Sequence, residues 1–335
     1  MPPMPGSTLI VGCGYLGGRV ADALVATGRP VFALTRSRTD ELTARGIRPT
    51  LGDVTDPGSL QKLPEVEWVV YAVGMDRAAG KSMREVYVGG LRNVLAGLPG
   101  SPRITYVSST GVYGQTAGEW VTEASATEPT EESGKVVLAA EQALREVRAD
   151  ATILRFAGIY GPGRLLRKQP LLKGDSFIGD ADKWLNLIHV ADGVRAVLLH
   201  DPTRGFGTPP LVEGRSAAEL PGGESSVSSP STPLPAGELT LPAPTSPQRG
   251  EVRRTPATTA GTFNISDGTP VTRRDFYTHL AKLIGAPPAR FEPSPTSGTE
   301  PNRRIDSRAA RAALGFTPQY PSFAEGLAAS VLDDA

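Results

Sequence analysis

A glycine-rich turn between two short apolar runs most constrains how this chain can fold. Residues 8–11 (TLIV) are apolar and partly β-branched, as in a buried strand, and they lead directly into GCGYLG. Apolar residues at helical spacing follow, and a second strand-like run lies at 30–34. Gly12 permits a tight turn, Gly14 lets a pyrophosphate approach the backbone, and Gly17 lets the helix pack close to the strand. Because both flanking strands are present, the motif predicts a strand–turn–helix unit that binds a dinucleotide.

Two further apolar runs extend this pattern through the first half of the chain. They lie at 67–73 and 104–107, and each follows a segment that can cross over as a helix. The alternation predicts an α/β fold of the Rossmann type, with a doubly wound parallel sheet.

The residues after the second run indicate which cofactor fits. NAD-specific folds place an acid there to bind the ribose 2′-hydroxyl, but this chain has Thr35, Arg36, Ser37 and Arg38 and no acid before Asp40. Arg36, with Ser37 and Arg38, suits a 2′-phosphate instead. The alternative is that both arginines simply face solvent in a loop. We therefore expect NADP as the cofactor, with NAD as the other possibility.

Composition argues against several other classes of function. Lys plus Arg and Asp plus Glu number 35 each, so no net charge favours nucleic acid or an anionic membrane. A single cysteine, Cys13, and three scattered histidines offer neither a disulfide framework nor a metal site. Glycines and charged residues interrupt the N-terminal apolar stretch, unlike a signal peptide or a membrane span. We expect a cytoplasmic protein without a metal, whose partner is a small molecule; its oligomeric state stays open.

Five stretches in a fixed order carry a resemblance to a known family. They are GCGYLG at 12–17, GDVTD at 52–56, VSSTGVYG at 107–114, ILRFAGIYGPG at 153–163 and LNLIHVADG at 185–193. Together they resemble the extended short-chain dehydrogenases/reductases, the NAD(P)-dependent epimerase/dehydratase group. The chain also looks like the atypical members that keep this glycine motif but lose the catalytic tetrad.

The resemblance implies how the domains are divided. A Rossmann domain covers 1–165 and is completed by about 184–206 and 261–268, while 166–183 and 269–335 form a small substrate-side subdomain. The segment 209–260 is rich in Pro, Ser, Thr and Gly and has too few apolar residues to bury a core. It is expected to be a disordered insert, with a regulatory or partner-binding role as the alternative.

The resemblance also implies which residues contact the cofactor. Asp53 and Val54 correspond to the pair that contacts adenine, and Ala72, Val73 and Gly74 to the strand end along the cofactor. The full expected set is Gly12, Gly14, Tyr15, Leu16, Gly17, Arg36, Ser37, Asp53, Val54, Ala72, Val73 and Gly74.

The catalytic residues of the family are only partly present. Ser109 occupies the position of the catalytic Ser/Thr that bonds the reacting substrate oxygen, although a hydroxyl bonded at a strand end is an equal alternative. The family pairs a tyrosine with a lysine four residues later, which lowers the pKa of the phenol. The register set by Ala140-Glu141 puts Ser133 and Val137 at these two positions, and no YxxxK occurs anywhere in the chain.

Other charged residues are candidates to replace the missing acid. They are Glu131, Glu132 and Lys135 in the same region and Asp76 with Arg77 after the fourth strand, near the expected nicotinamide end. Solvent-exposed charge is the alternative interpretation of each.

Several further residues match the family in other roles. The resemblance gives Tyr113, Arg155 and Tyr160 mainly architectural roles, and it implies that His189 and Asp192 shape the floor of the substrate pocket. Arg303 or Arg304 can reach a substrate phosphate or carboxylate, or can face water.

Two functions of different classes remain open. The first is an NAD(P)-dependent epimerase, dehydratase or reductase without the YxxxK pair, which acts on a hydroxyl- or keto-bearing small molecule, with a nucleotide sugar as the family default. The second is a non-catalytic NADP(H)-binding protein that senses redox state or serves as a scaffold.

Overall fold

The computed structural model describes residues 4–202, 261–293 and 300–333. The predicted insert 209–260 lies outside the described residues.

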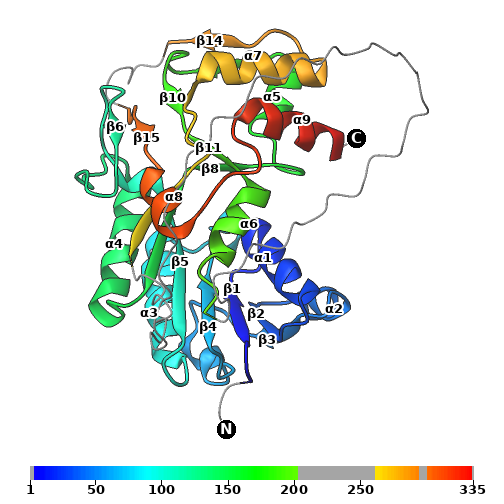
Figure 1. Cartoon of the computed structure of the whole chain (residues 1–335), viewed down its shortest axis with the longest axis vertical. Coiled ribbons are helices and arrows are strands. Elements are labelled where there is room, and N and C mark those ends of the chain that lie inside the picture. The colour runs from blue at the N-terminus through cyan, green and yellow to red at the C-terminus, as the bar shows by residue number, and fades with distance from the viewer. Residues whose placement is uncertain (1–3, 203–260, 294–299, 334–335) are drawn as a thin grey trace, which may run out of the picture. The chain divides into compact units, whose positions relative to one another are not determined.

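A seven-stranded parallel sheet forms the centre of the described part of the chain, in the order β12-β7-β5-β4-β1-β2-β3 (Figure 1). The chain builds outward from β1 in one direction and then returns to continue from β4 in the other, so the sheet is doubly wound as predicted. The strands are β1 (Thr8–Val11), β2 (Val31–Thr35), β3 (Arg48–Leu51), β4 (Trp68–Tyr71), β5 (Arg103–Ser109), β7 (Thr152–Phe156) and β12 (Thr262–Ile265).

The four apolar runs noted in the sequence correspond to β1, β2, β4 and β5: the first matches its strand at both ends, and the ends of the other three differ by one or two residues. Every residue of β1 and β4 is buried, which explains their continuous apolar sequence.

Helices cover both faces of the sheet. Apolar side chains of α3 and α4 pack with Leu9 and Val11 on one face, whereas those of α1, α6 and α8 pack with Ile10 on the other. The helices are α1 (Tyr15–Ala26), α2 (Thr39–Ala44), α3 (Gly90–Gly97), α4 (Glu132–Val147), α5 (Lys168–Lys173), α6 (Val190–Leu198), α7 (Arg273–Ile284), α8 (Arg308–Leu314) and α9 (Phe323–Asp333). Short 3-10 turns lie at Pro57–Leu60, Arg77–Ala79 and Thr110–Val112, and a π-helical turn at Glu85–Gly89 leads into α3.

A second apolar core lies beside the carboxyl ends of the central strands. Phe177, Phe276 and Leu280 are fully buried in it, together with side chains of α5, α7 and α9. Four two-stranded sheets frame this part: β6 (Trp120–Val121) with β15 (Arg304–Ile305), β8 (Gly158–Tyr160) with β11 (Leu187–His189), β9 (Ser176–Ile178) with β14 (Arg290–Glu292), and β10 (Trp184–Leu185) with β13 (Val271–Thr272). The boundaries between a cofactor-binding and a substrate-side part stay a prediction.

A buried ion pair joins α4 to the sheet. Arg155 on β7 donates to both carboxylate oxygens of Glu141 on α4, at 2.7 Å from Nη2 and at 3.0 and 3.3 Å from Nε, and Ser108 on β5 also donates to Glu141. Arg155 further donates to the Tyr113 hydroxyl at 2.9 Å, which donates to Asn264 on β12 at 2.8 Å. Burial alone would lower the pKa of Arg155, but its bonds to Glu141 outweigh burial and raise it. The network therefore connects three adjacent strands and one helix.

His189 and Asp192, at the start of α6, bind the C-terminal segment that contains Gln319, Tyr320 and Ser330. Asp192 is fully buried and accepts backbone N–H bonds from Gln319 and Tyr320 at 2.5 and 2.9 Å. The ring of His189 lies 3.2 Å from the Ser330 hydroxyl and packs edge-on against Tyr160. These contacts favour the structural interpretation of both residues.

We predict that Glu141→Ala lowers the free energy of unfolding by about 3–5 kcal/mol, because it leaves the Arg155 guanidinium buried without its counter-charge. Denaturant unfolding measures the change. The control is Glu146→Ala on the same helix, which breaks an exposed 3.3 Å pair with Arg92 and should change stability by less than about 1 kcal/mol. Equal effects of the two variants would contradict the structural role of Glu141.

Candidate nucleotide and substrate site

The glycine turn after β1 has the close backbone contacts that its sequence predicts. Gly12 has a φ of +94°, and a Cβ added there would lie 2.5 Å from the Ala72 carbonyl. A Cβ at Gly17 would lie 2.2 Å from the Gly12 oxygen, so the turn also packs tightly on α1. A Cβ at Gly14, in contrast, would meet nothing within 4 Å. The turn is thus closed on its protein side and open at Gly14, where a pyrophosphate would lie.

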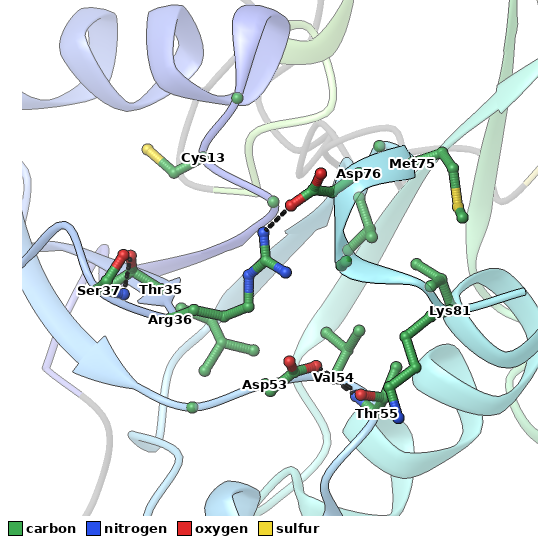
Figure 2. Close-up of a pocket in the computed structure, with 18 of the residues that line it drawn as sticks. Cys13, Thr35, Arg36, Ser37, Asp53, Val54, Thr55, Met75, Asp76 and Lys81 are labelled. Carbon is green, nitrogen blue, oxygen red and sulfur yellow. Dashed lines mark hydrogen bonds and ion pairs between the residues drawn. The ribbon is translucent and has the colours of Figure 1, made fainter. Parts of the chain in front are cut away.

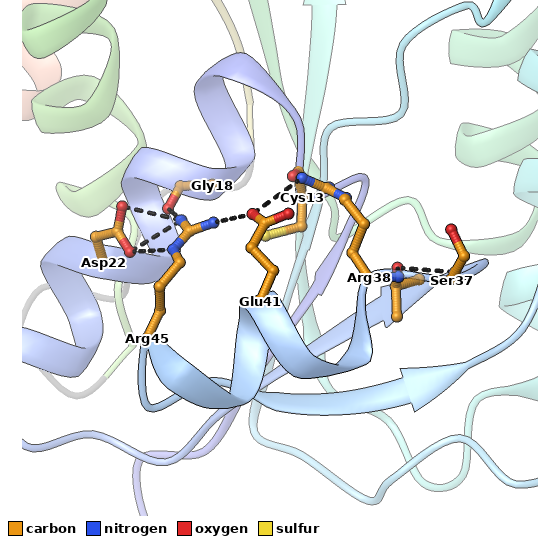
Figure 3. A network of polar contacts seen from close by, with 8 residues as sticks. Cys13, Gly18, Asp22, Ser37, Arg38, Glu41 and Arg45 are labelled. Atoms are coloured by element: carbon orange, nitrogen blue, oxygen red, sulfur yellow. Dashed lines mark hydrogen bonds and ion pairs between the residues drawn. The ribbon is translucent and has the colours of Figure 1, made fainter.

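Side chains from the segment after β2 anchor this turn from outside (Figure 3). Arg38 donates to the carbonyl of Cys13, and Arg45 donates to the Gly18 carbonyl at 3.0 Å and to Asp22 at 2.9 Å. Glu41 accepts hydrogen bonds from both arginines. Gly14 caps α1 without a side-chain hydrogen bond, so no capping side chain covers the helix N-terminus.

A pocket of about 450 Å³ opens beside the turn, over the carboxyl ends of β1, β2 and β4 (Figure 2). Its lining includes eight of the predicted cofactor residues: Gly12, Gly14, Arg36, Ser37, Asp53, Val54, Val73 and Gly74. This position beside the strand at which the sheet changes direction is where doubly wound folds bind nucleotides.

Four of the predicted cofactor residues do not line this pocket. The Tyr15 hydroxyl donates to the Pro162 carbonyl at 3.0 Å, and Leu16 packs in the apolar core near Gly193. Gly17 and Ala72 serve the turn through their backbones instead. The side chains of Tyr15 and Leu16 are thus engaged in protein contacts, while the N–H groups of the first turn of α1 would be available to an anion.

A carboxylate that is distant in sequence lies close to Arg36. Arg36 donates to the Asp76 carboxylate at 2.6 Å across the pocket. The hydrogen bond with Asp76 raises the pKa of Arg36, and the same bond, with the Ala78 N–H, lowers the pKa of Asp76. Asp76 therefore lies beside Arg36 rather than at the expected nicotinamide end.

A second pocket, of about 360 Å³, adjoins the first at Val73, which lines both. Ser109 and Val137 both line it, so the structure brings together the two residues that the resemblance assigns to the serine and lysine positions. The Ser109 Oγ accepts the Gly111 N–H at 3.0 Å, which fulfils the alternative role of a hydroxyl bonded at a strand end. Its proton remains available to donate.

Neither Ser133 nor Val137, at the positions expected for the tyrosine and the lysine, can supply an acid. Ser133 is exposed in the first turn of α4, and Val137 is buried against Val112 and Tyr113. Glu131, Glu132 and Lys135 are exposed and do not line this pocket. These charges therefore fit their alternative interpretation as solvent-exposed groups.

Sequence reasoning missed two phenols that line the second pocket, Tyr87 and Tyr106. Burial raises the pKa of both, so both are protonated at neutral pH. Tyr87 lies in the π-helical turn before α3, a feature often found at functional sites. That turn depends on backbone geometry, which the sequence pattern does not indicate.

The two C-terminal arginines lie in different surroundings. Arg303 donates to the Thr110 carbonyl at 2.7 Å, next to Ser109, and burial lowers its pKa. Arg304 packs over the rings of Trp120 and Trp184, 5.1 and 5.3 Å from their centres. Only Arg303 lies close to the second pocket.

The profile of the NAD dependent epimerase/dehydratase family matches residues 8–202. The chain belongs to this family. Protein YeeZ of Escherichia coli strain K12 is 26% identical to this chain, and the match covers 93% of this chain and 95% of YeeZ. A solved structure from Methylobacillus flagellatus, described as an NAD-dependent epimerase/dehydratase, is 28% identical to this chain. The match covers 97% of each chain, with a TM-score of 0.66.

A solved structure of lower sequence identity shares the fold. DesIV, a dTDP-glucose 4,6-dehydratase from Streptomyces venezuelae solved with NAD and TYD bound, is 21% identical, and the match covers 98% of this chain and 96% of DesIV. Its TM-score is 0.69. The family is NAD(P)-dependent. The first pocket, with free space beside Gly14, suits such a dinucleotide.

The described residues offer neither a membrane-spanning helix nor a metal-binding cluster. No helix among them is long and apolar enough to cross a membrane. Within the same residues, no three His, Cys, Asp or Glu side chains gather as a metal site would require.

We predict different outcomes for alanine at the two neighbouring glycines. Gly14→Ala should leave thermal stability nearly unchanged but weaken dinucleotide binding by about tenfold or more, because its methyl group projects into the space of the pyrophosphate. Gly17→Ala should lower the melting temperature, because its methyl group collides with the Gly12 carbonyl. Thermal melting with NADP⁺ titration tests the pair. Tight binding by a stable Gly14→Ala protein would place the pyrophosphate elsewhere.

Proposed function

We propose that this protein is an NADP-preferring oxidoreductase of the epimerase/dehydratase family that acts slowly on a hydroxyl- or keto-bearing small molecule. The observation that carries this proposal is a continuous row of groups along the carboxyl ends of neighbouring strands. It runs from Arg36 after β2, past Gly14 and Val73, to Ser109 at the end of β5.

The first pocket supplies the groups to hold the cofactor. Arg36 and Ser37 would bind the phosphorylated ribose, Asp53 and Val54 the adenine, and the turn at Gly14 the pyrophosphate. The nicotinamide, when bound, supplies the carbon that gives or takes hydride. The shared lining at Val73 supports its placement at the second pocket.

The second pocket can orient a substrate oxygen but lacks an efficient acid. The Ser109 hydroxyl can donate a hydrogen bond to that oxygen, and Arg303 next to it provides positive charge for an acidic substrate group. MoeE5, whose solved structure is 21% identical to this chain, is in complex with UDP-glucuronic acid and NAD, and this supports a nucleotide sugar as the proposed substrate class. Without the tyrosine and lysine, proton transfer must use a weaker donor.

The same gap favours a second candidate, a non-catalytic NADP(H)-binding redox sensor or scaffold. Exposed Ser133 and buried Val137 cannot move a proton, yet the cofactor pocket beside them retains its glycine turn. Turnover separates the two functions. A cytoplasmic location belongs to both proposals, because the single buried cysteine suits a reducing compartment.

Arg36→Ala should remove the preference for NADPH over NADH. A charge-assisted bond to the 2′-phosphate contributes on the order of 1.5–3 kcal/mol, so NADPH affinity should fall at least about tenfold while NADH affinity changes little. Calorimetric titration of both cofactors measures this. Equal affinities in the wild-type protein would remove the NADP argument.

The wild-type protein should oxidise NADPH only slowly with ketones and nucleotide sugars, because loss of a positioned acid typically removes ~10²–10⁴ of rate. Ser109→Ala should slow it further. Ser133→Tyr combined with Val137→Lys should raise the rate, since it puts a phenol and an ammonium on one face of α4. Thermal melting checks that the new lysine leaves the fold intact.

The outcomes distinguish the two functions. Rapid turnover that survives Ser109→Ala would overturn the slow-enzyme proposal and direct attention to Tyr87→Phe. Tight NADPH binding with no turnover in wild type or double variant would favour the non-catalytic function.

A further inference from the structure

The ion pair between Arg36 and Asp76 lies across the entrance for the cofactor's ribose. Arg36 follows β2 and Asp76 follows β4, and Figure 2 shows the guanidinium extending over the pocket to the carboxylate. Both side chains line the pocket, and each is about half exposed, at 52% and 47%. A ligand that enters therefore meets the pair rather than a free arginine.

Asp76 is held in position independently of Arg36. It caps the short 3-10 turn Arg77–Ala79, and its Oδ1 accepts the Ala78 N–H at 3.0 Å. Its other oxygen, Oδ2, accepts the bond from Arg36. The lowered pKa of this carboxyl keeps it ionised at neutral pH. A fixed negative charge thus faces the side chain expected to bind a 2′-phosphate.

The other charged groups of this pocket have different contacts. Arg38 bonds to the Cys13 carbonyl and to Glu41, and Asp53 accepts two bonds from Thr55. Lys81 also lines the pocket and is exposed. Among the described residues of this pocket, Arg36 and Asp76 are the two that pair with each other across it.

We propose that Asp76 is a specificity-determining residue that reduces the preference for 2′-phosphorylated cofactors. It does so in two ways. A 2′-phosphate must displace Asp76 from Arg36 before it can bind there, and it then lies close to a carboxylate of the same sign. A cofactor with a free 2′-hydroxyl disturbs neither group. This inference rests on the proposed binding of NADP at Arg36.

The expected effect is moderate because the pair is exposed to solvent. Exposed ion pairs are weak, and salt screens them further. Asp76→Asn should therefore raise NADP⁺ affinity by about three- to tenfold at low salt, and less at high salt. The affinity for NAD⁺ should stay within about twofold. The asparagine keeps the oxygen that accepts the Ala78 N–H, so the turn itself should persist.

The experiment is calorimetric titration of NADP⁺, NAD⁺, adenosine 2′,5′-bisphosphate and 5′-AMP at low and high salt. The proteins are wild type, Asp76→Asn, Arg36→Ala, the double variant and Asp56→Asn. Asp56 is the matched control, because it is also exposed and caps a 3-10 turn by accepting the Gly58 N–H at 3.0 Å, outside this pocket. The Asp56→Asn variant should leave the affinities for all four ligands unchanged.

Each outcome decides one point. A gain for the two 2′-phosphorylated ligands alone, reduced in the Arg36→Ala background, supports the proposal. If Arg36→Ala removes the NADP preference but Asp76→Asn has no effect, this inference fails and the proposed cofactor stands. If Arg36→Ala also has no effect, the proposed NADP site fails. A loss of NAD⁺ affinity in Asp76→Asn would show that Asp76 accepts a bond from the ribose, which overturns the competition.

Discussion

The buried pair of Glu141 and Arg155 sets the geometry on which the second pocket depends. Its removal would leave a charge inside the protein, so neither partner can change alone without a large loss of stability. Ser108, which bonds to Glu141, is the neighbour of Ser109, and Val137 lies one helical turn before Glu141. The strand end and the helix face that line the second pocket are thus joined by one electrostatic contact.

The same contact holds α4 in place independently of the residues at the positions that the resemblance assigns to the tyrosine and the lysine. The half of α4 that carries Glu141 is bound to the sheet, whereas the tyrosine position, Ser133, is exposed in the first turn. Exchange at Ser133 therefore leaves no cavity and no unpaired charge. Val137 packs with Val112 and Tyr113, so an apolar contact occupies the place of the lysine. The position of α4 therefore depends on Glu141 and on apolar packing, and not on Ser133.

The sequence predicted those features that depend on local pattern. The glycine turn, four buried strands and the arginine after β2 follow from residue types within a few positions of one another. The pairing of Arg36 with Asp76 does not, because these residues are 40 apart in sequence and meet only through the order of β2, β1 and β4. Tyr15 was assigned to the cofactor by its motif, but the direction of the first helical turn points its ring toward Pro162. Tyr87 escaped notice because a π-helical turn decides where its phenol faces.

The segment from Arg36 to Arg45 lines the nucleotide pocket at one end and contacts the first turn of α1 at the other. Arg36 faces the ribose region, while Arg38 and Arg45 are bonded to carbonyls of the glycine turn and of the first turn of α1. Movement of this segment at one end would therefore strain its bonds at the other. The adenosine and pyrophosphate parts of a dinucleotide would then bind cooperatively, and the affinities of two half-molecules would not add up to that of the whole.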